Sequence, residues 1–281
     1  MKYFNIFWKG MVIGIANIIP GVSGGTMAFI FGLFDQLTEA LGNWATDKEK
    51  RLSYTIFLFV LGCGAIIGIL VFARIFRILL GSDVLSQPTY LFFAGLIGGS
   101  LPFLITSMED KKPNIKRILL FLLAAFLVIL TTVLKSNSVD MTAGPIVITP
   151  LYGLWLIFCG FLAAGSMIIP GFSGSALLVS LGEYNNILMF VDERMLVPVA
   201  LVGVGAIGGI LIVARIIDIA LKKAFSGTMY FIIGLVIASF YALGVEVAHQ
   251  FNANVYVILT SLITFILGIA VAYGFSKISK E

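Results

Sequence analysis

The chain has 281 residues, of which 60% are hydrophobic and 11% are charged, and its mean hydropathy is +1.09. This composition excludes a water-soluble globular domain, because only lipid tolerates so much apolar surface. The net charge of +4 indicates membrane topology rather than nucleic-acid binding, and no nucleic-acid partner is expected.

Apolar segments long enough to cross a bilayer follow one another along the chain. Crossing a hydrocarbon core of ~30 Å takes about 20 residues of helix. The sequence predicts such helices at 55–80, 89–107, 117–134, 196–221, 227–246 and 255–276. Two further apolar segments, 3–37 and 151–182, are interrupted by similar motifs, IIPGVSGGT at 18–26 and IIPGFSGSA at 168–176. The predicted fold class is therefore an all-α polytopic membrane protein.

The two motifs belong to a longer internal repeat. GMVIGIANIIPGVSGGTMAFIFGLF at 10–34 aligns without a gap on GFLAAGSMIIPGFSGSALLVSLGEY at 160–184. LGCGAIIGILVFAR at 61–74 then matches VGVGAIGGILIVAR at 202–215, and TYLFFAGLIGGS at 89–100 matches TMYFIIGLVIAS at 228–239. Gly, Ser, Pro and Arg match as well as the apolar residues. The pattern therefore indicates two homologous halves, 1–140 and 141–281.

The distribution of Lys and Arg decides how the two halves are oriented. If segment 3–37 crosses the membrane once, the basic residues divide almost evenly between the two sides. If it turns at its motif and returns, each half is a re-entrant helical hairpin plus three transmembrane helices, and the halves are inverted. All basic residues except Arg74, Arg77, Lys135 and Arg194 then share one side, which the positive-inside rule makes cytoplasmic. Two inverted repeats with broken helices are typical of transporters, and both termini are predicted to be cytoplasmic.

The motifs predict an anion site. Pro20 and Pro170 end a helix, and backbone opened within a membrane must be satisfied by protein or water. Asn17 in the first segment and Ser166, one place before the residue aligned with Asn17, are placed to hydrogen-bond it. Each tip is expected to present helix N-terminal N–H groups and hydroxyls that suit a phosphate. The predicted substrate-binding residues are Gly21, Ser23, Gly24, Gly25 and Thr26 in the first motif and Gly171, Ser173, Gly174 and Ser175 in the second. The alternative is that small residues only allow close helix packing, which is the preferred interpretation for the other glycines, such as Gly62, Gly68, Gly95, Gly98, Gly203 and Gly209.

Four charged residues are further candidates. Arg74 and Arg215 occupy equivalent positions in the repeat, each near the end of a long span. Charged side chains within a membrane are costly and usually functional, and Arg suits bidentate contact with phosphate; snorkelling to the interface is the alternative. Asp35 and Glu183 follow the motifs and are candidates for a coupling cation or proton, or else are interfacial charges.

Residue types that enzymes and metal sites need are scarce. His249 is the single histidine, and Cys63 and Cys159 lie inside apolar segments without metal-ligand spacing. The sequence contains no P-loop, GxSxG elbow or HExxH motif. An acid–base or metal site is therefore hard to assemble, and the chain is predicted not to be an enzyme and to need no metal or cofactor.

At the two motifs the sequence resembles a known family. NIIPGVSGGTMAFIFGLFDQL and MIIPGFSGSALLVSLGEYNNIL are similar to the paired signatures of the bacterial polyprenyl-phosphate transporter family. The resemblance covers nearly the whole chain. It implies a protein of the bacterial cytoplasmic membrane that returns undecaprenyl phosphate to the inner leaflet and so recycles the lipid carrier of envelope synthesis. That family often has an acidic residue three places before the first motif proline, where this chain has Asn17.

The predicted function is therefore a flippase for undecaprenyl phosphate, with the phosphate held at the tips and the tail left in lipid. Its expected partners are this polyprenyl-phosphate lipid and the surrounding membrane lipids, and a homo-oligomer stays open. Two alternatives remain at this point. A polyprenyl-pyrophosphate phosphatase would need a general base and would release phosphate, and a carrier or channel for a small anion would need a closed aqueous pathway rather than an opening toward lipid.

Overall fold

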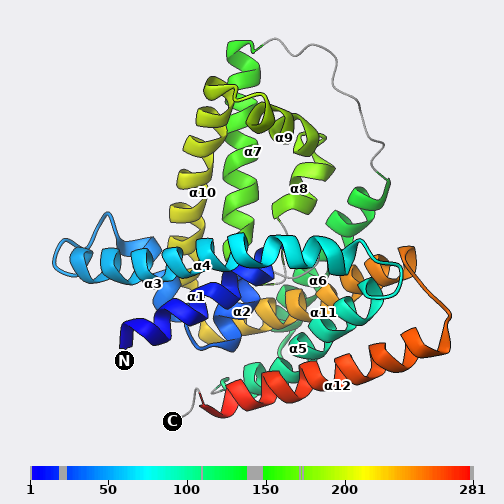
Figure 1. Cartoon of the computed structure of the whole chain (residues 1–281). Helices are drawn as coiled ribbons and strands as arrows, with labels where there is room; N and C mark the ends of the chain where they lie inside the picture. The colour runs from blue at the N-terminus through cyan, green and yellow to red at the C-terminus, as the bar shows by residue number, and fades with distance from the viewer. Residues whose placement is uncertain are drawn as a thin grey trace.

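The computed structural model describes residues 2–18, 24–108, 110–137, 148–170, 172 and 174–278. All regular structure in these ranges is helical (Figure 1). The first six helices are α1 (Lys2–Ile18), α2 (Gly24–Ile30), α3 (Phe34–Asn43), α4 (Arg51–Leu80), α5 (Ser86–Thr106) and α6 (Ile115–Asn137). The next six are α7 (Pro150–Ile168), α8 (Gly174–Ser180), α9 (Tyr184–Asp192), α10 (Leu196–Lys223), α11 (Phe225–His249) and α12 (Val255–Ile278).

The order of helix lengths repeats. The first series has 17, 7, 10, 30, 21 and 23 residues, and the second has 19, 7, 9, 28, 25 and 24. Each series therefore has a medium helix, two short ones and three long ones, in the order that the sequence repeat predicts. The orientation of the two series relative to a membrane stays a prediction.

Seven helices of the described residues are long and apolar enough to span a membrane: α4, α5, α6, α7, α10, α11 and α12. Six of them correspond to the predicted spans, so the multi-pass character of the chain is confirmed. The seventh, α7, is the first arm of the broken segment at 151–182. In α4 and α6 only 22% and 11% of the most apolar window is buried by protein. These outward apolar faces are the surfaces that lipid would cover.

Both broken segments fold back on themselves. In the first, the Lys9 ammonium of α1 donates to the Phe31 carbonyl at 3.0 Å, and the Trp8 and Phe31 rings meet edge to face at 5.2 Å. In the second, Glu183 at the start of α9 accepts hydrogen bonds from the first turns of α7. Figure 1 shows α8 and α9 returning along α7 toward the end at which α7 begins. In each segment the helices on either side of the motif therefore lie against one another; the re-entrant course through a membrane stays a prediction.

Each first hairpin arm packs closely on a long helix of its own series: α1 on α4, and α7 on α10. Glycine makes the approach possible. A Cβ atom at Gly68 would lie against the Met11 carbonyl oxygen, and one at Gly209 against that of Phe161. Gly95 of α5 meets the Phe265 carbonyl of α12 in the same way. The packing interpretation of these three glycines is confirmed. It is wrong for Gly62 and Gly203, where nothing lies within 4 Å of an added Cβ atom, and Gly98 meets only the Phe240 side chain at 3.5 Å.

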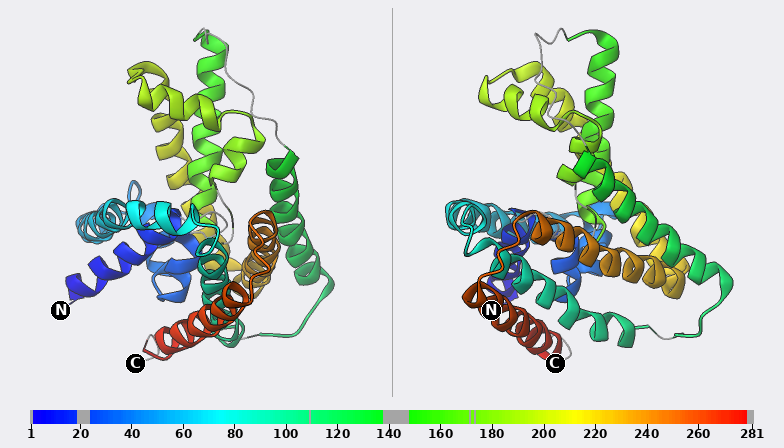
Figure 2. Two further views of the ribbon diagram at one scale, coloured as in Figure 1. Left: turned by 45° about the vertical axis from the view of Figure 1, so that its right-hand side comes forward. Right: turned by 90° about the vertical axis from the view of Figure 1, so that its right-hand side faces the viewer.

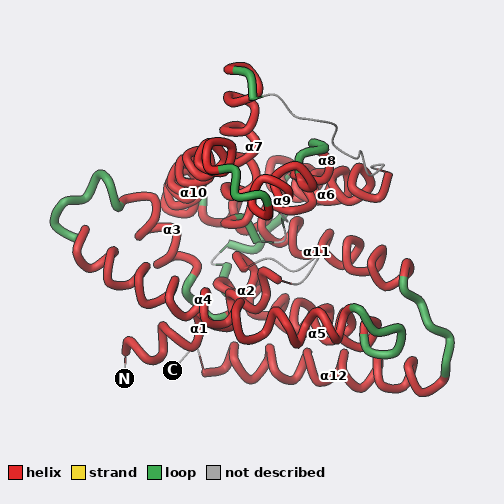
Figure 3. Tube along the Cα trace, turned by 45° about the horizontal axis from the view of Figure 1, so that its top comes forward, coloured by secondary structure: helices red, strands yellow, loops and turns green. Residues whose placement is uncertain are grey.

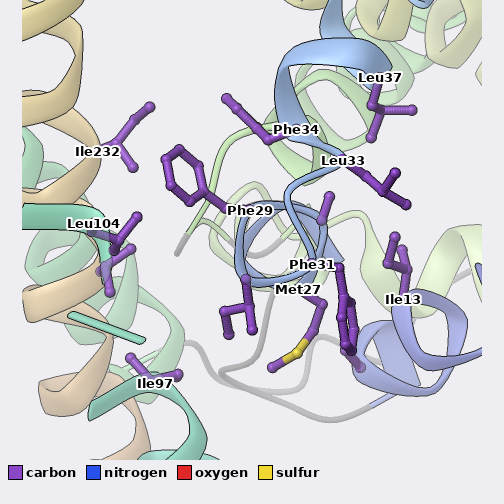
Figure 4. Packing of buried hydrophobic residues seen from close by; sticks show 14 of the residues in the cluster. Ile13, Met27, Phe29, Phe31, Leu33, Phe34, Leu37, Ile97, Leu104 and Ile232 are labelled. Carbon is purple, nitrogen blue, oxygen red and sulfur yellow. The ribbon is translucent and has the colours of Figure 1, made fainter. Parts of the chain in front are cut away.

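The last helix of each series packs on the other series. Helix α6 lies along α11, and α12 lies along α5 (Figures 2 and 3). The boundary between the halves at 140 stays a prediction from the sequence repeat, and helices from the two sides of it pack on one another. The main buried cluster lies where they meet and includes Met27, Ala28, Phe29 and Ile30 of α2, a helix whose seven residues are all buried. In Figure 4 Phe29 of α2 and Phe34 of α3 point toward Ile232 of α11.

Candidate functional site

The two motifs meet in space. Helix α2, which follows the first motif turn, begins against the last residues of α7, where the second motif begins. A Cβ atom at Gly25 would be 2.5 Å from the Ile168 carbonyl oxygen and 3.1 Å from the carbonyl carbon of Ile169. Only glycine fits such a backbone approach. Two segments separated by more than half of the chain therefore form one region of the molecule.

Part of the opened backbone at the first motif is satisfied by Asn17. Its side-chain oxygen accepts a hydrogen bond of 3.0 Å from the Gly24 amide, the first residue of α2. The expectation that Asn17 holds the broken backbone is confirmed, and this amide is already engaged within the protein. Ser166 behaves differently, because its hydroxyl donates to the Ala163 carbonyl of its own helix.

The two motifs lie in unequal surroundings. Gly24, Gly25 and Thr26 are buried, and Thr26 is only 1% exposed. In the second motif Gly174 is buried against the Ala163 carbonyl of α7, whereas Ser175 is exposed. The other predicted tip residues, Gly21, Ser23, Gly171 and Ser173, lie outside the described residues.

Arg215 joins a polar network between the two series of helices. Its guanidinium donates to the side-chain oxygen of Asn43 in α3 and lies 3.6 Å from the Asp218 carboxylate. Asp218, 4% exposed, also accepts from the Asn43 amide at 3.0 Å and pairs with Lys222 at 2.8 Å. The guanidinium is thus held by α3 and by its own helix. Arg74 lies in α4, but its side chain is outside the described part of the structure.

Two residues of the network around Arg215 were not predicted from the sequence. Asp218 and Asn43 were not among the predicted site residues. The available signal was an acidic residue one turn after Arg215 inside a long apolar span, a spacing at which side chains on a helix face each other.

Glu183 is a buried carboxylate that accepts hydrogen bonds from neutral side chains. It is 7% exposed and accepts from the Tyr152 hydroxyl at 2.7 Å, the Trp155 indole at 3.0 Å and the Asn186 amide at 2.9 Å. Hydrogen bonds of this kind stabilise a buried carboxylate without a cation. Asp35, in the first turn of α3, is exposed. The two acidic candidates therefore occupy different environments.

An apolar cavity of about 510 Å³ adjoins the second motif. Its walls come from α3, α6, α10, α11 and the motif itself. The lining residues are Phe34, Leu120, Ile169, Pro170, Val213, Ile216, Ile217, Ala220, Ala224, Gly227, Thr228, Phe231 and Ile232. The Thr228 hydroxyl donates to the Ala224 carbonyl at 3.0 Å, so the polar group of this lining is satisfied within the helix. Such a wall suits a hydrocarbon chain.

Nothing in the described part of the chain resembles a metal centre: no group of three or more His, Cys, Asp or Glu side chains is placed to hold an ion. The arrangement offers instead a contact between the start of α2 and the end of α7, a polar network on α10 and an apolar cavity.

Comparison of the sequence with known proteins identifies its family. Residues 13–254 match the model of the VCA0040-like, undecaprenyl phosphate translocase-like family. This chain belongs to that family. A polyprenyl-phosphate transporter of Vibrio cholerae serotype O1 is 30% identical over 250 residues, which cover 85% of this chain and 77% of the relative. A polyprenyl-phosphate transporter of Staphylococcus aureus is 27% identical across 100% of this chain and 98% of its own length. No solved structure matches the chain.

Membership confirms the resemblance drawn from the two motifs. The match spans both hairpins and the helices between them, so the motifs belong to the shared architecture of the translocase-like family rather than to a local similarity.

Proposed function

We propose that this protein is a flippase that carries undecaprenyl phosphate across the bacterial cytoplasmic membrane and so returns the lipid carrier for cell-envelope synthesis. The observation that carries the proposal is the contact between the two motif turns at Gly25 and Ile168. In a family whose curated members are named polyprenyl-phosphate transporters, this contact marks a single central site. The protein acts by transport, and no catalytic group is assigned.

The phosphate group is the part of the substrate that needs protein. A charged group in hydrocarbon is costly, whereas amide and hydroxyl donors at an opened backbone can replace its water. We assign this role to Gly21, Ser23, Gly25 and Thr26 of the first motif and to Gly171, Ser173, Gly174 and Ser175 of the second. Gly24 has a positioning role, because its amide already binds Asn17.

Movement of the substrate requires two alternating exposures of this site. We propose that the two halves are inverted repeats and that the hairpins enter the membrane from opposite faces, with both termini cytoplasmic. The unequal burial of the motifs supports this reading: α2 is completely buried, whereas most of α8 is only half-buried. Two equivalent elements in unequal surroundings are what one of the two states would contain.

The charged candidates have secondary roles in this proposal. Arg215 aligns α10 with α3 through Asn43, and Arg74 is its repeat counterpart on α4. The Arg215 guanidinium is available to the phosphate only when Asn43 and Asp218 release it. Glu183 and Asp35 remain candidates for the coupling cation or proton. Of the two, Glu183 is the stronger candidate, because it is buried and no ion pair within the described residues neutralises it.

The test uses purified protein in liposomes that contain undecaprenyl phosphate, and follows the fraction of head groups accessible from outside. Ser23→Ala/Ser173→Ala removes one hydroxyl from each turn, and Ser53→Ala, on the exposed face of α4, is the matched control. We expect protein-dependent exchange between leaflets that the double variant reduces at least about 10-fold, the value of roughly one lost hydrogen bond to a charged group.

Three other outcomes contradict the proposal. Release of inorganic phosphate from the pyrophosphate form would make the protein a phosphatase. Transport of free phosphate without the lipid would make it a small-anion carrier. Exchange that is equally fast in Ser23→Ala/Ser173→Ala and in Ser53→Ala would remove the motif hydroxyls from the site.

A further inference from the structure

We propose that the apolar cavity beside the second motif is a binding subsite for the phosphate-proximal isoprene units of the lipid substrate. This inference rests on the proposed function and extends it to the tail, for which neither the motifs nor the comparisons assign a place.

The cavity has a buried inner end and an outer end that reaches the surface of the helices. Phe34 and Ile232 are each 2% exposed and form its inner end. Ile216 is 59% exposed and Leu120 is 36% exposed, so the wall formed by α10 and α6 reaches the outer surface of the helices. That outer surface is apolar and would face lipid. A chain can therefore enter sideways from the hydrocarbon without passing through water.

The inner wall borders the proposed phosphate site. Ile169 and Pro170 of the second motif line the cavity, and Gly25 of the first motif lies against Ile168 and Ile169. An apolar chain in the cavity would thus end beside both motif turns. A phosphorylated isoprenoid has this order of parts, with one anionic end and a hydrocarbon chain that starts next to it.

Helix α10 separates the cavity from the polar network. Val213, Ile216, Ile217 and Ala220 recur at helical spacing and face the cavity. The polar residues Arg215, Asp218 and Lys222 lie on the opposite side of the helix, where α3 and Asn43 meet it. The cavity side of α10 therefore carries no charged residue, and the polar network on the other side holds α10 against α3.

The volume of the cavity limits how much of the chain it holds. About 510 Å³ lies within the range of ~300–1,000 Å³ that is usual for ligand pockets. With roughly 30 Å³ per carbon, about the volume of one water in the liquid, this volume takes on the order of 15 carbons, or three isoprene units. Longer chains would leave the remainder in the lipid.

The test uses a photoreactive farnesyl phosphate, which has 15 carbons, with the full-length protein in lipid nanodiscs. We expect crosslinks in the peptides that contain 213–220 and 227–232. Gly227→Leu fills the cavity from α11, because a Cβ atom there already touches Leu120 at 3.4 Å. Gly244→Leu is the matched control, since this glycine of the same helix faces open space. Labelling should fall by about 10-fold or more in Gly227→Leu and stay unchanged in Gly244→Leu.

The readouts separate this inference from the proposed function. Leaflet exchange in wild type together with crosslinks outside 213–232, or equal labelling of Gly227→Leu and Gly244→Leu, would overturn the tail subsite and leave the flippase. Competition by farnesol as strong as by farnesyl phosphate, without leaflet exchange, would keep the chain subsite and overturn the flippase. The wild-type crosslinks decide the matter if Gly227→Leu does not fold.

Discussion

The close contact between α3 and α10 predicts that adding one methyl group, in Gly42→Ala, lowers the stability of the protein. A Cβ atom at Gly42 would lie 2.7 Å from the Cα atom and 2.9 Å from the amide nitrogen of Arg215. Both are backbone atoms of a long helix, so they cannot move aside as a side chain can. Gly42→Ala must therefore push α3 away from α10 and strain the hydrogen bonds between Asn43 and the Arg215–Asp218 pair.

The expected magnitude follows from two opposing terms. Alanine is favoured over glycine inside a helix by about 0.5–1 kcal/mol, and overpacking costs about 1–3 kcal/mol. Gly62 in α4 is the matched control, because nothing lies within 4 Å of a Cβ atom there. Gly62→Ala keeps the favourable term alone. We expect Gly42→Ala to be less stable than Gly62→Ala by about 1–3 kcal/mol, the size of the overpacking term.

The measurement is thermal unfolding of the two variants and wild type in one detergent and at one protein concentration. A difference of 1–3 kcal/mol corresponds to roughly 2–10 °C in a chain of this size. The expected order of unfolding temperature is Gly62→Ala at or above wild type and Gly42→Ala below Gly62→Ala. If Gly42→Ala unfolds at or above the temperature of Gly62→Ala, α3 does not contact α10 as described and the network between them loses its basis.

Three further results are expected. Asp218→Ala should destabilise the protein by about 0.5–1.5 kcal/mol in the same unfolding assay, because the half-buried Asn43 amide loses its acceptor and the partly exposed Arg215 and Lys222 lose an ion-pair partner. Asp218→Asn should cost less because it keeps an acceptor for Asn43; equal costs would contradict this reading of the network. Gly25→Ala, which places a Cβ atom 2.5 Å from the Ile168 carbonyl oxygen, should reduce leaflet exchange about 10-fold or more, whereas Gly203→Ala, which meets open space, should not; full activity of Gly25→Ala would separate the motif contact from transport. Single cysteines at Lys111 and Arg194 should react with impermeant reagents from the cytoplasmic and the opposite side respectively, and labelling from one common side would refute the inverted arrangement.

The positions of the long helices could be predicted because their causes are local. The predicted span at 55–80 corresponds to Arg51–Leu80, and that at 255–276 to Val255–Ile278. Uninterrupted apolar runs fix such helices whatever surrounds them. The breaks after Ile18 and Ile168 are equally local, since proline and glycine end helices without help from neighbours.

The partners of the charged residues could not be predicted in the same way. Arg215 was expected to bind ligand or to snorkel, and the structure engages it with Asn43, a residue of the other half. Glu183 has Tyr152 and Trp155 as donors because the hairpin returns to its own start. Such pairs depend on how distant segments meet, which neither hydropathy nor spacing records.

The proposed phosphate site could be predicted from the sequence only in part. The sequence repeat predicts that both motifs matter, and the structure brings Gly25 to Ile168. The apolar cavity has no signature in the sequence, because Val213, Ile216 and Phe231 are ordinary residues of apolar spans. Only the packing of α6, α10 and α11 around Pro170 makes a cavity of them.

The exchange of the last helices has a consequence for how the chain is made. Helix α5 packs along α12, which is synthesised after all the other described helices. During synthesis α5 must therefore remain in the bilayer, covered by lipid or by an insertion factor, until α12 has been inserted. A chain that stops after α11 would retain the pairing of α6 with α11 and leave α5 without its partner. The first series of helices therefore completes its packing only after the second series has been made.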